Sequence, residues 1–382
     1  MAAIPHCKLL SVDTDLAYDV QLYHRGVKRR ELLGRGAYGV VCKMAGGVVK
    51  LQSPKRVERA RVDQEYYFKL ACMEARILCD LSERGISVVP KVKWALIGDR
   101  RVAIGMEETG SNICEAYFKQ GFLPTLNKIR KIARRWLIGL GQIHRAGVIH
   151  CDLKPTNLTM KYILDFGISQ RVDNLNQKRL ACSRWYRPPE VILGLGYTTK
   201  IDLFSLGAVL YELYTGYNLF PVDNQRSYML TDLQHLYHFL DVMEKDEFPE
   251  SLMENARDYC VLDEKTQKKN LLQNEKDNRI EEFTPFLERM KETKKERRNS
   301  DEDFSLWMDL LKKLLEFDPE KRLSAQDALK HPFFAQRAKR DVEEDECKES
   351  PPEEVKSPPR RTLSAFETPN PFAALMDEEM RV

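Results

Sequence analysis

A short stretch of polar residues constrains this chain more than any other feature. The run HCDLKPTN occupies positions 150–157, and the tripeptide DFG follows at 165–167. In such a set, Asp152 can orient a hydroxyl and accept its proton, and Lys154 can stabilise negative charge on a group in transfer. Asn157 and Asp165 carry the hard oxygen ligands that Mg²⁺ prefers. Phosphoryl transfer needs charge neutralisation and positioning more than covalent chemistry, so the set predicts a phosphoryl-transfer site.

A glycine-rich stretch lies far upstream of this run. The sequence GRGAYGVV places Gly34, Gly36 and Gly39 at GxGxxG spacing, with Arg35 inside the turn and Val41 just after it. Glycines let the backbone approach a phosphate closely, because no Cβ stands in the way. A dinucleotide-binding fold uses the same spacing but requires a helix directly after the glycines, whereas the Val-Val-Cys run predicts a strand. An ordinary glycine turn remains an alternative reading of these residues alone.

One lysine follows the glycine turn by a single hairpin. Lys50 lies in VVKL on a predicted strand, where a lone lysine often faces solvent. Glu74 in MEARIL lies on the next predicted helix and can reach back to Lys50. An ion pair between them would hold the amine extended toward a phosphate. Glu65 is a rival partner on the same predicted helix.

The hydrophobic periodicity changes along the chain. Residues up to about 108 alternate like strands, with tight turns and one helix between about 57 and 81. After Thr109 the pattern is mainly helical, with a long amphipathic helix in IRKIARRWLIGLGQIHRAG and an apolar, buried one in IDLFSLGAVLYELYTG. We therefore expect an α+β fold with two lobes: a small antiparallel sheet with one main helix, then a larger, mainly helical lobe.

These patterns predict an organisation into four parts. We expect an N-terminal flank at 1–28, a first lobe at 29–108, a second lobe at 109–337 with a charged, weakly patterned segment at 222–303, and an acidic, disordered tail at 338–382. From Asp341 onward there are twelve acids and five bases, so the tail carries −7 and the remainder +10. The acids could dock on the basic body or bind regulators, and a solvated tail is the alternative.

Composition excludes several classes of protein. The nine cysteines contain no CxxC pair, which argues against a disulfide framework or a zinc site. No apolar run is long enough to cross a bilayer, and no secretory signal is evident. We expect protein partners, with no membrane and no direct nucleic-acid binding, in the nucleus and/or the cytoplasm. Basic runs at 28–30 and 294–298 could aid nuclear entry or be ordinary solvated surface.

Together these motifs resemble the eukaryotic protein kinases from about Arg30 to Phe334. The stretch SRWYRPPEVILG is similar to the CMGC group, and within it to the dual-specificity tyrosine-regulated, homeodomain-interacting and Cdc-like branches. The resemblance implies a two-lobed kinase fold, ATP and Mg²⁺ as cofactors, and Ser/Thr hydroxyls of proteins as acceptors. Lys154, two residues after Asp152, is the Ser/Thr-kinase pattern. Tyrosine autophosphorylation is implied by resemblance only.

The resemblance also implies a role for each candidate site residue. The ATP-covering loop would contain Gly34, Arg35, Gly36, Gly39 and Val41, and the strand lysine with its helix partner would be Lys50 and Glu74. The catalytic aspartate and its lysine would be Asp152 and Lys154, and the Mg²⁺ ligands would be Asn157 and Asp165. The adenine pocket would include Met106, Glu107 and Thr109.

Three supporting contacts are implied in the same way. Glu190 would pair with Arg322, and Asp202 would cap the backbone of the catalytic loop. Ser183 would touch both Asp152 and Lys154. Arg187 resembles an arginine that lines the pocket after the phosphoacceptor.

The chain departs from the kinase pattern at its activation segment. Cys151 stands where most relatives have an arginine that grips a phosphate or an acid, and Leu180 stands where tyrosine-regulated relatives carry a self-phosphorylated tyrosine. We therefore predict activity without activation-segment phosphorylation. A redox or metal role for Cys151 is an alternative.

The leading hypothesis for function is a protein kinase. A pseudokinase or scaffold with the same fold is the second hypothesis, and a small-molecule kinase is the third. The complete catalytic set favours the protein kinase.

Overall fold

The computed structural model describes residues 8–11, 21–22, 24–35, 39–52, 64–98, 100–175, 181–222, 228–263, 265–272, 283–335 and 355–356. The chain forms two compact units. Among the described residues, the first unit comprises those up to Gly110 together with Lys161–Ser169, and the second comprises Ser111–Met160 and those from Gln170 onward. No helix in this described portion is long and apolar enough to cross a membrane.

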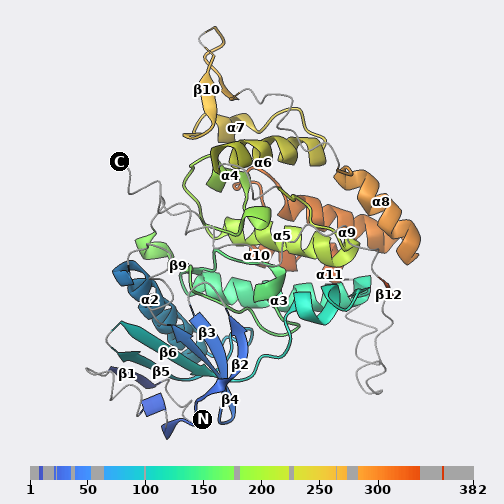
Figure 1. Ribbon diagram of the computed structural model, residues 1–382. Coiled ribbons are helices and arrows are strands. Elements are labelled where there is room, and N and C mark those ends of the chain that lie inside the picture. Colours follow the sequence, from blue (N-terminus) through green and yellow to red (C-terminus); the bar gives the residue numbers. More distant parts are fainter. Residues whose placement is uncertain are drawn as a thin grey trace. The chain divides into compact units, whose positions relative to one another are not determined.

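The first unit contains the antiparallel sheet that the sequence predicts (Figure 1). Its strands lie in the order β1-β5-β6-β4-β3-β2, and all neighbours except β1 and β5 run antiparallel. The turn between β3 and β4 uses Gly46 at φ 71°, a conformation that favours glycine. The strands are β1 (Lys8–Ser11), β2 (Lys28–Arg35), β3 (Gly39–Met44), β4 (Gly47–Gln52), β5 (Val92–Gly98) and β6 (Arg101–Met106).

Strand β1 adds an element that the sequence did not predict. It pairs in parallel with β5, from Lys8 opposite Trp94 to Ser11 opposite Ile97. An unpaired strand edge exposes a row of backbone donors and acceptors, and β1 covers that of β5. Four residues carry too weak a pattern to identify such a strand, because its partner lies more than eighty positions away.

Helix α2 (Gln64–Glu83) packs against β5 and β6 of the same unit (Figure 1). Residues 53–63, where the predicted helix was to begin, lie outside the described ones. The predicted buried face is present, and its members are Tyr67, Leu70, Ala71, Glu74, Ile77 and Leu78. Glu74 is therefore a carboxylate on the apolar face of the helix.

Helix α5 (Lys200–Thr215) forms the centre of the second unit and contacts α3, α8 and α9 (Figure 1). It is buried from Ile201 to Thr215, as its all-round apolar pattern predicts. Helix α3 (Leu126–Arg145) begins at Thr125, whose side chain accepts a hydrogen bond from the Lys128 N–H. Helix α5 ends at Gly216, which has φ 81°.

The insert at 222–303 is more ordered than its sequence pattern indicates. It contains α6, α7, a hairpin of β10 and β11, and α8. The remaining elements are η3 (Cys114–Phe118), β7 (Phe122–Leu123), β8 (Val148–Ile149), η4 (Pro155–Asn157), β9 (Gln170–Arg171), η5 (Val172–Asn174), η6 (Arg184–Tyr186), α4 (Pro189–Ile192), α6 (Tyr228–Val242), α7 (Glu250–Met253), β10 (Cys260–Leu262), β11 (Lys269–Leu271), α8 (Phe286–Arg297), α9 (Asp301–Leu314), α10 (Ala325–Leu329), α11 (Pro332–Ala335) and β12 (Val355–Lys356).

The acidic tail is described at β12 alone. This strand pairs antiparallel with β7, with Val355 opposite Leu123 and Lys356 opposite Phe122. The rest of 338–382 lies outside the described residues.

Candidate active site

An ion cluster forms in the first unit around Lys50. Its Nζ donates to Glu74 Oε1 at 2.6 Å and to Asp165 Oδ1 at 2.7 Å. The predicted pair of Lys50 and Glu74 is therefore present. The rival Glu65 instead pairs with Lys69 at 2.7 Å on the exposed side of α2. Two carboxylates hold the amine of Lys50 in one extended conformation.

Charge balance within this cluster depends on burial and on the neighbouring groups. Burial opposes the charged form of Lys50, but the Asp165 and Glu74 carboxylates outweigh it, so the pKa of Lys50 is raised above its ordinary value. Burial also raises the pKa of Glu74, while Lys50 and a hydrogen bond from Gln52 Nε2 at 2.5 Å oppose that rise. The cluster thus holds a cationic amine beside two acidic groups.

Sequence reasoning missed Gln52, although a signal for it exists. Residues two apart on a strand point to the same side, so Gln52 had to lie beside Lys50 on β4. Its amide fixes the second oxygen of Glu74 and thereby supports the lysine.

The DFG segment belongs to the first unit rather than to the unit that holds the HCDLKPTN run. Asp165 has φ 63°, and its side chain is 42% exposed. A Cβ on Gly167 would lie 3.2 Å from Asp165 Oδ1 and 3.5 Å from Glu74 Oε2, so glycine keeps this side of the cluster clear. A partly exposed carboxylate held by a lysine fits the donor chemistry of a Mg²⁺ ligand.

The glycines of the predicted phosphate loop differ in why they are needed. A Cβ on Gly34 would meet nothing within 4 Å, so packing does not require glycine there. A Cβ on Gly39 would come within 2.3 Å of the Leu51 carbonyl oxygen, so the sheet alone requires that glycine. Gly36 lies outside the described residues. Gly34 therefore retains the stronger indication of a ligand role.

Two further loop residues are placed by strand pairing. Arg35 pairs with Val40 across the turn, and Val41 lies opposite Lys50 on the adjacent strand. Val41 is half-buried beside the strand that carries the lysine.

The predicted adenine-pocket residues follow the end of β6. Met106 closes that strand opposite Val48 and Val92. The Glu107 N–H donates to the Lys91 carbonyl at 3.1 Å, and Glu107 Oε1 accepts from the Lys91 N–H at 2.8 Å. Because the main-chain N–H of Glu107 already bonds to Lys91, its main-chain carbonyl is the group suited to accept a hydrogen bond from a ligand. Thr109 is half-buried.

In the second unit, Asp202 caps the catalytic loop as predicted. Its two carboxylate oxygens accept the N–H groups of His150 and Cys151, each at 2.9 Å. His144 Nε2 lies 2.8 Å from Asp202 Oδ2. Burial alone would raise the pKa of Asp202, but these contacts with His144 and His150 lower it below its ordinary value. The ionised carboxylate of Asp202 thus holds the backbone of the loop at His150 and Cys151.

Around Asp152 the loop brings four predicted side chains together. The Ser183 hydroxyl donates to Asp152 Oδ1 at 2.6 Å, and Lys154 Nζ donates to Ser183 Oγ at 2.9 Å. Lys154 Nζ also lies 2.9 Å from Asp152 Oδ2. Asn157 Nδ2 donates to the Asp152 carbonyl at 2.9 Å and to Oδ2 at 3.0 Å. With its nitrogen so engaged, the amide oxygen of Asn157 is the atom suited to a cation.

Cys151 is fully buried beside this group. Its thiol donates to the Ile149 carbonyl at 3.6 Å, and its own carbonyl accepts the Cys182 N–H at 2.7 Å. A neutral, enclosed thiol cannot bind a phosphate as arginine does. In the described part of the chain, no three His, Cys, Asp or Glu side chains cluster suitably for a metal ion.

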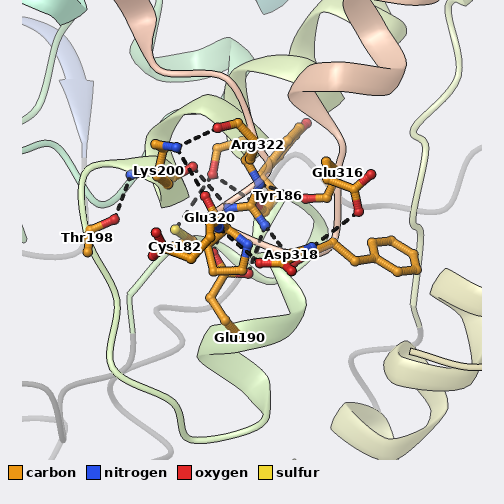
Figure 2. A network of polar contacts seen from close by, with 12 residues as sticks. Cys182, Tyr186, Glu190, Thr198, Lys200, Glu316, Asp318, Glu320 and Arg322 are labelled. Carbon is orange, nitrogen blue, oxygen red and sulfur yellow. Dashed lines mark hydrogen bonds and ion pairs between the residues drawn. The ribbon is translucent and has the colours of Figure 1, made fainter. Parts of the chain in front are cut away.

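A second buried ion pair anchors the end of the activation segment (Figure 2). Arg322 Nη1 and Nη2 donate to Glu190 Oε1 and Oε2 at 2.6 and 2.9 Å, so the pair that the resemblance implies is present and has bidentate geometry. Arg322 also donates to the carbonyls of Glu316 and Phe317, and its guanidinium lies 5.0 Å from the Phe204 ring. The pair thus links α4 to the segment that precedes α10.

Comparison with known proteins shows the family of this chain. The model of the protein kinase domain matches residues 27–334. The chain is 28% identical to the probable serine/threonine-protein kinase clkA of Dictyostelium discoideum, covering 72% of this chain and 32% of that protein. It is 28% identical to dual specificity tyrosine-phosphorylation-regulated kinase 3 of Rattus norvegicus, covering 82% and 55%. For dual specificity protein kinase CLK1 of Mus musculus the identity is 27%, covering 80% and 65%.

The chain spans only about a third to just over half the length of the first of these relatives. The match to the domain model nevertheless covers most of this chain, and the relatives come from the CMGC branches that the activation segment resembles. This chain therefore belongs to the protein kinase family and resembles its CMGC members.

Proposed function

We propose that this protein is a Mg²⁺- and ATP-dependent protein kinase that transfers the γ-phosphate to Ser/Thr hydroxyls. The contact of Ser183 with Asp152 and Lys154 carries the proposal. A hydroxyl lies 2.6 Å from a carboxylate oxygen and 2.9 Å from a lysine amine. An acceptor hydroxyl needs the same two partners, one to take its proton and one to stabilise the charge that develops.

Each half of the site contributes a separate part of this chemistry. Asp152 orients the acceptor hydroxyl and accepts its proton, while Lys154 stabilises negative charge on the transferred group. Lys50, held by Glu74, is suited to bind phosphate oxygens. Asp165 in the first unit and Asn157 in the second would each offer an oxygen donor to Mg²⁺, and the ion would neutralise charge on the phosphates.

The relatives favour the same acceptor class. Their names include serine/threonine and dual specificity protein kinases. In this chain, Lys154 touches the hydroxyl that mimics an acceptor, which supports Ser/Thr transfer. A pseudokinase has less support, because Lys50, Glu74, Asp152, Asn157 and Asp165 are all present and each makes a contact suited to its role.

Incorporation of labelled γ-phosphate into a peptide library tests the function. The full chain should label Ser- and Thr-containing peptides in the presence of Mg²⁺. Asp165→Ala should label none above background, because it removes both a metal ligand and a partner of Lys50. Labelling by neither protein would favour the scaffold, and equal labelling by both would refute the role of Asp165.

We further propose that activity does not require phosphorylation of the activation segment. The support is Cys151, which places a buried neutral thiol where a phosphate-binding arginine would be needed. Treating the purified protein with a phosphatase, with mass spectrometry to verify phosphate removal, should leave kcat unchanged. A severalfold drop in kcat that ATP incubation restores would contradict this proposal.

Partners and location are also proposals. The pairing of β12 with β7 and the opposite charges of tail and body support binding of the acidic tail to the kinase body. Deleting residues after Ala338 should then change the KM for a peptide substrate, and an unchanged KM and rate would remove the idea.

We propose a nuclear and/or cytoplasmic location from the basic runs at 28–30 and 294–298, which microscopy of the tagged chain can check.

A further inference from the structure

A buried carboxylate faces two arginines that lie one and four residues after Ser183. Asp232 on α6 is 3% exposed, and its Oδ1 lies 3.7 Å from Arg187 Nη1 and 4.0 Å from Arg184 Nε. The side chains of Arg187 and Arg184 are 0% and 9% exposed. All three groups belong to the second unit.

One of these arginines holds the backbone just before Ser183. Arg187 Nε donates to the carbonyls of Ala181 and Cys182 at 3.1 and 3.2 Å, and Nη2 donates to Cys182 at 3.1 Å. The Cys182 N–H in turn bonds to Cys151 of the catalytic loop. The position of the Ser183 hydroxyl next to Asp152 therefore depends on the position of the Arg187 side chain.

A second part of the charged insert, the chain that leads into β10, also contacts Asp232. The Tyr259 hydroxyl, one residue before β10, donates to Asp232 Oδ2 at 3.2 Å. Burial and the negative charge of Asp232 raise the pKa of Tyr259, so this hydroxyl keeps its proton. His235, one turn along α6, stays neutral because burial and the positive charges of Arg187 and Arg184 lower its pKa. Asp232 is thus a buried anion set against two buried cations.

Charge arithmetic shows what Asp232 does for the segment. The negative charge of Asp232 and the positive charges of Arg184 and Arg187 sum to one net positive charge. Without the charge of Asp232, two guanidinium groups would face each other in a buried site. Leaving a buried charge without its counter-ion is strongly unfavourable, so one or both arginines would move. Movement of Arg187 would release the 181–182 carbonyls and displace Ser183.

We propose that Asp232 is a positioning residue, a built-in anion that holds residues 181–187 in their active arrangement without a phosphate on the activation segment. Asp232 lies on α6 of the charged insert, and Tyr259 connects it to the β10–β11 hairpin of the same insert, so the insert helps to set the arrangement. This inference rests on the proposed kinase function and on its independence from phosphorylation, and it names the group that makes that independence possible.

Kinetics of four variants test the proposal. Asp232→Asn keeps the size of the side chain and removes its charge, and we expect kcat to fall on the order of tenfold to a hundredfold with KM for ATP little changed. Asp232→Asn combined with Arg184→Gln restores one net positive charge and should recover most of kcat. Tyr259→Phe should lower kcat less than Asp232→Asn does. Asp246→Asn, an exposed acid beyond the end of α6, is the matched control and should not change kcat.

Hydrogen–deuterium exchange supplies a readout that does not need activity. Peptides covering 181–187 should exchange faster in Asp232→Asn and return toward the wild-type rate in the double variant. An Asp232→Asn protein with wild-type kcat and exchange overturns the inference. A loss of kcat that only follows the loss of folded protein, with no recovery in the double variant, overturns it as well. An inactive wild-type protein would count against the kinase function, and exchange would still decide the role of Asp232.

Discussion

Replacing Asp152 with asparagine should lower kcat by about 10²- to 10⁴-fold, the usual contribution of a positioned general base. Asparagine has nearly the same shape and can still accept a hydrogen bond from Ser183, but it cannot take a proton. The Lys50 cluster lies in the other unit and should be unaffected, so KM for ATP should stay near the wild-type value. Steady-state assays on a peptide from the library measure both quantities.

Asp173→Asn provides the control for this result. Asp173 is an exposed acid in η5, and its loss should leave kcat unchanged. If Asp152→Asn retained more than a tenth of wild-type kcat, Asp152 would not be the base, and the contact between Ser183 and Asp152 would be structural only.

Replacing Arg322 with glutamine should destabilise the protein by about 3–5 kcal/mol, the range for breaking a buried ion pair by removing one partner. The change leaves the Glu190 carboxylate buried at 0% exposure without its bidentate partner. It also removes the hydrogen bonds to Glu316 and Phe317 and the contact with the Phe204 ring. Denaturant unfolding of the second unit, followed by circular dichroism, measures the loss.

Two comparisons make the stability result specific. Lys313→Gln breaks an exposed pair with Asp309 on α9 and should cost at most about 1 kcal/mol. Glu190→Gln combined with Arg322→Gln removes both charges, so it should be less destabilising than Arg322→Gln alone. Equal losses in the single and double variants would show that the charge of Glu190 is not what makes the single change costly.

The two ion clusters have different purposes. The pair of Glu190 and Arg322 is fully enclosed and makes bidentate bonds, as expected of an anchor. The Lys50 cluster includes a carboxylate that is 42% exposed, so it remains open to a ligand. The difference in exposure agrees with a structural role for Glu190 and Arg322 and with the phosphate-binding role that we propose for Lys50.

Short-range motifs allowed much of the site to be predicted. Asp152, Lys154 and Asn157 lie in one loop of eight residues, so their contacts follow from local backbone geometry. Strand alternation and helical spacing likewise predicted β2 to β6, α2, α3 and α5, because burial of one face imposes its period on the sequence. For the long-range pair of Lys50, strand and helix placement left both Glu74 and Glu65 as candidates, and the pair of Glu190 with Arg322 came from resemblance to a family alone.

Contacts between distant segments with no pattern of their own were decided by the tertiary structure. The sequence determined which groups are suited to the proposed chemistry and which faces are buried, since both depend on residue type and spacing. Tertiary packing placed β1 on β5, the DFG aspartate in the unit that contains Lys50, Gln52 on Glu74, and Asp232 against Arg184 and Arg187. A buried charge is stable only beside its partner, and only the folded chain determines which partner lies there.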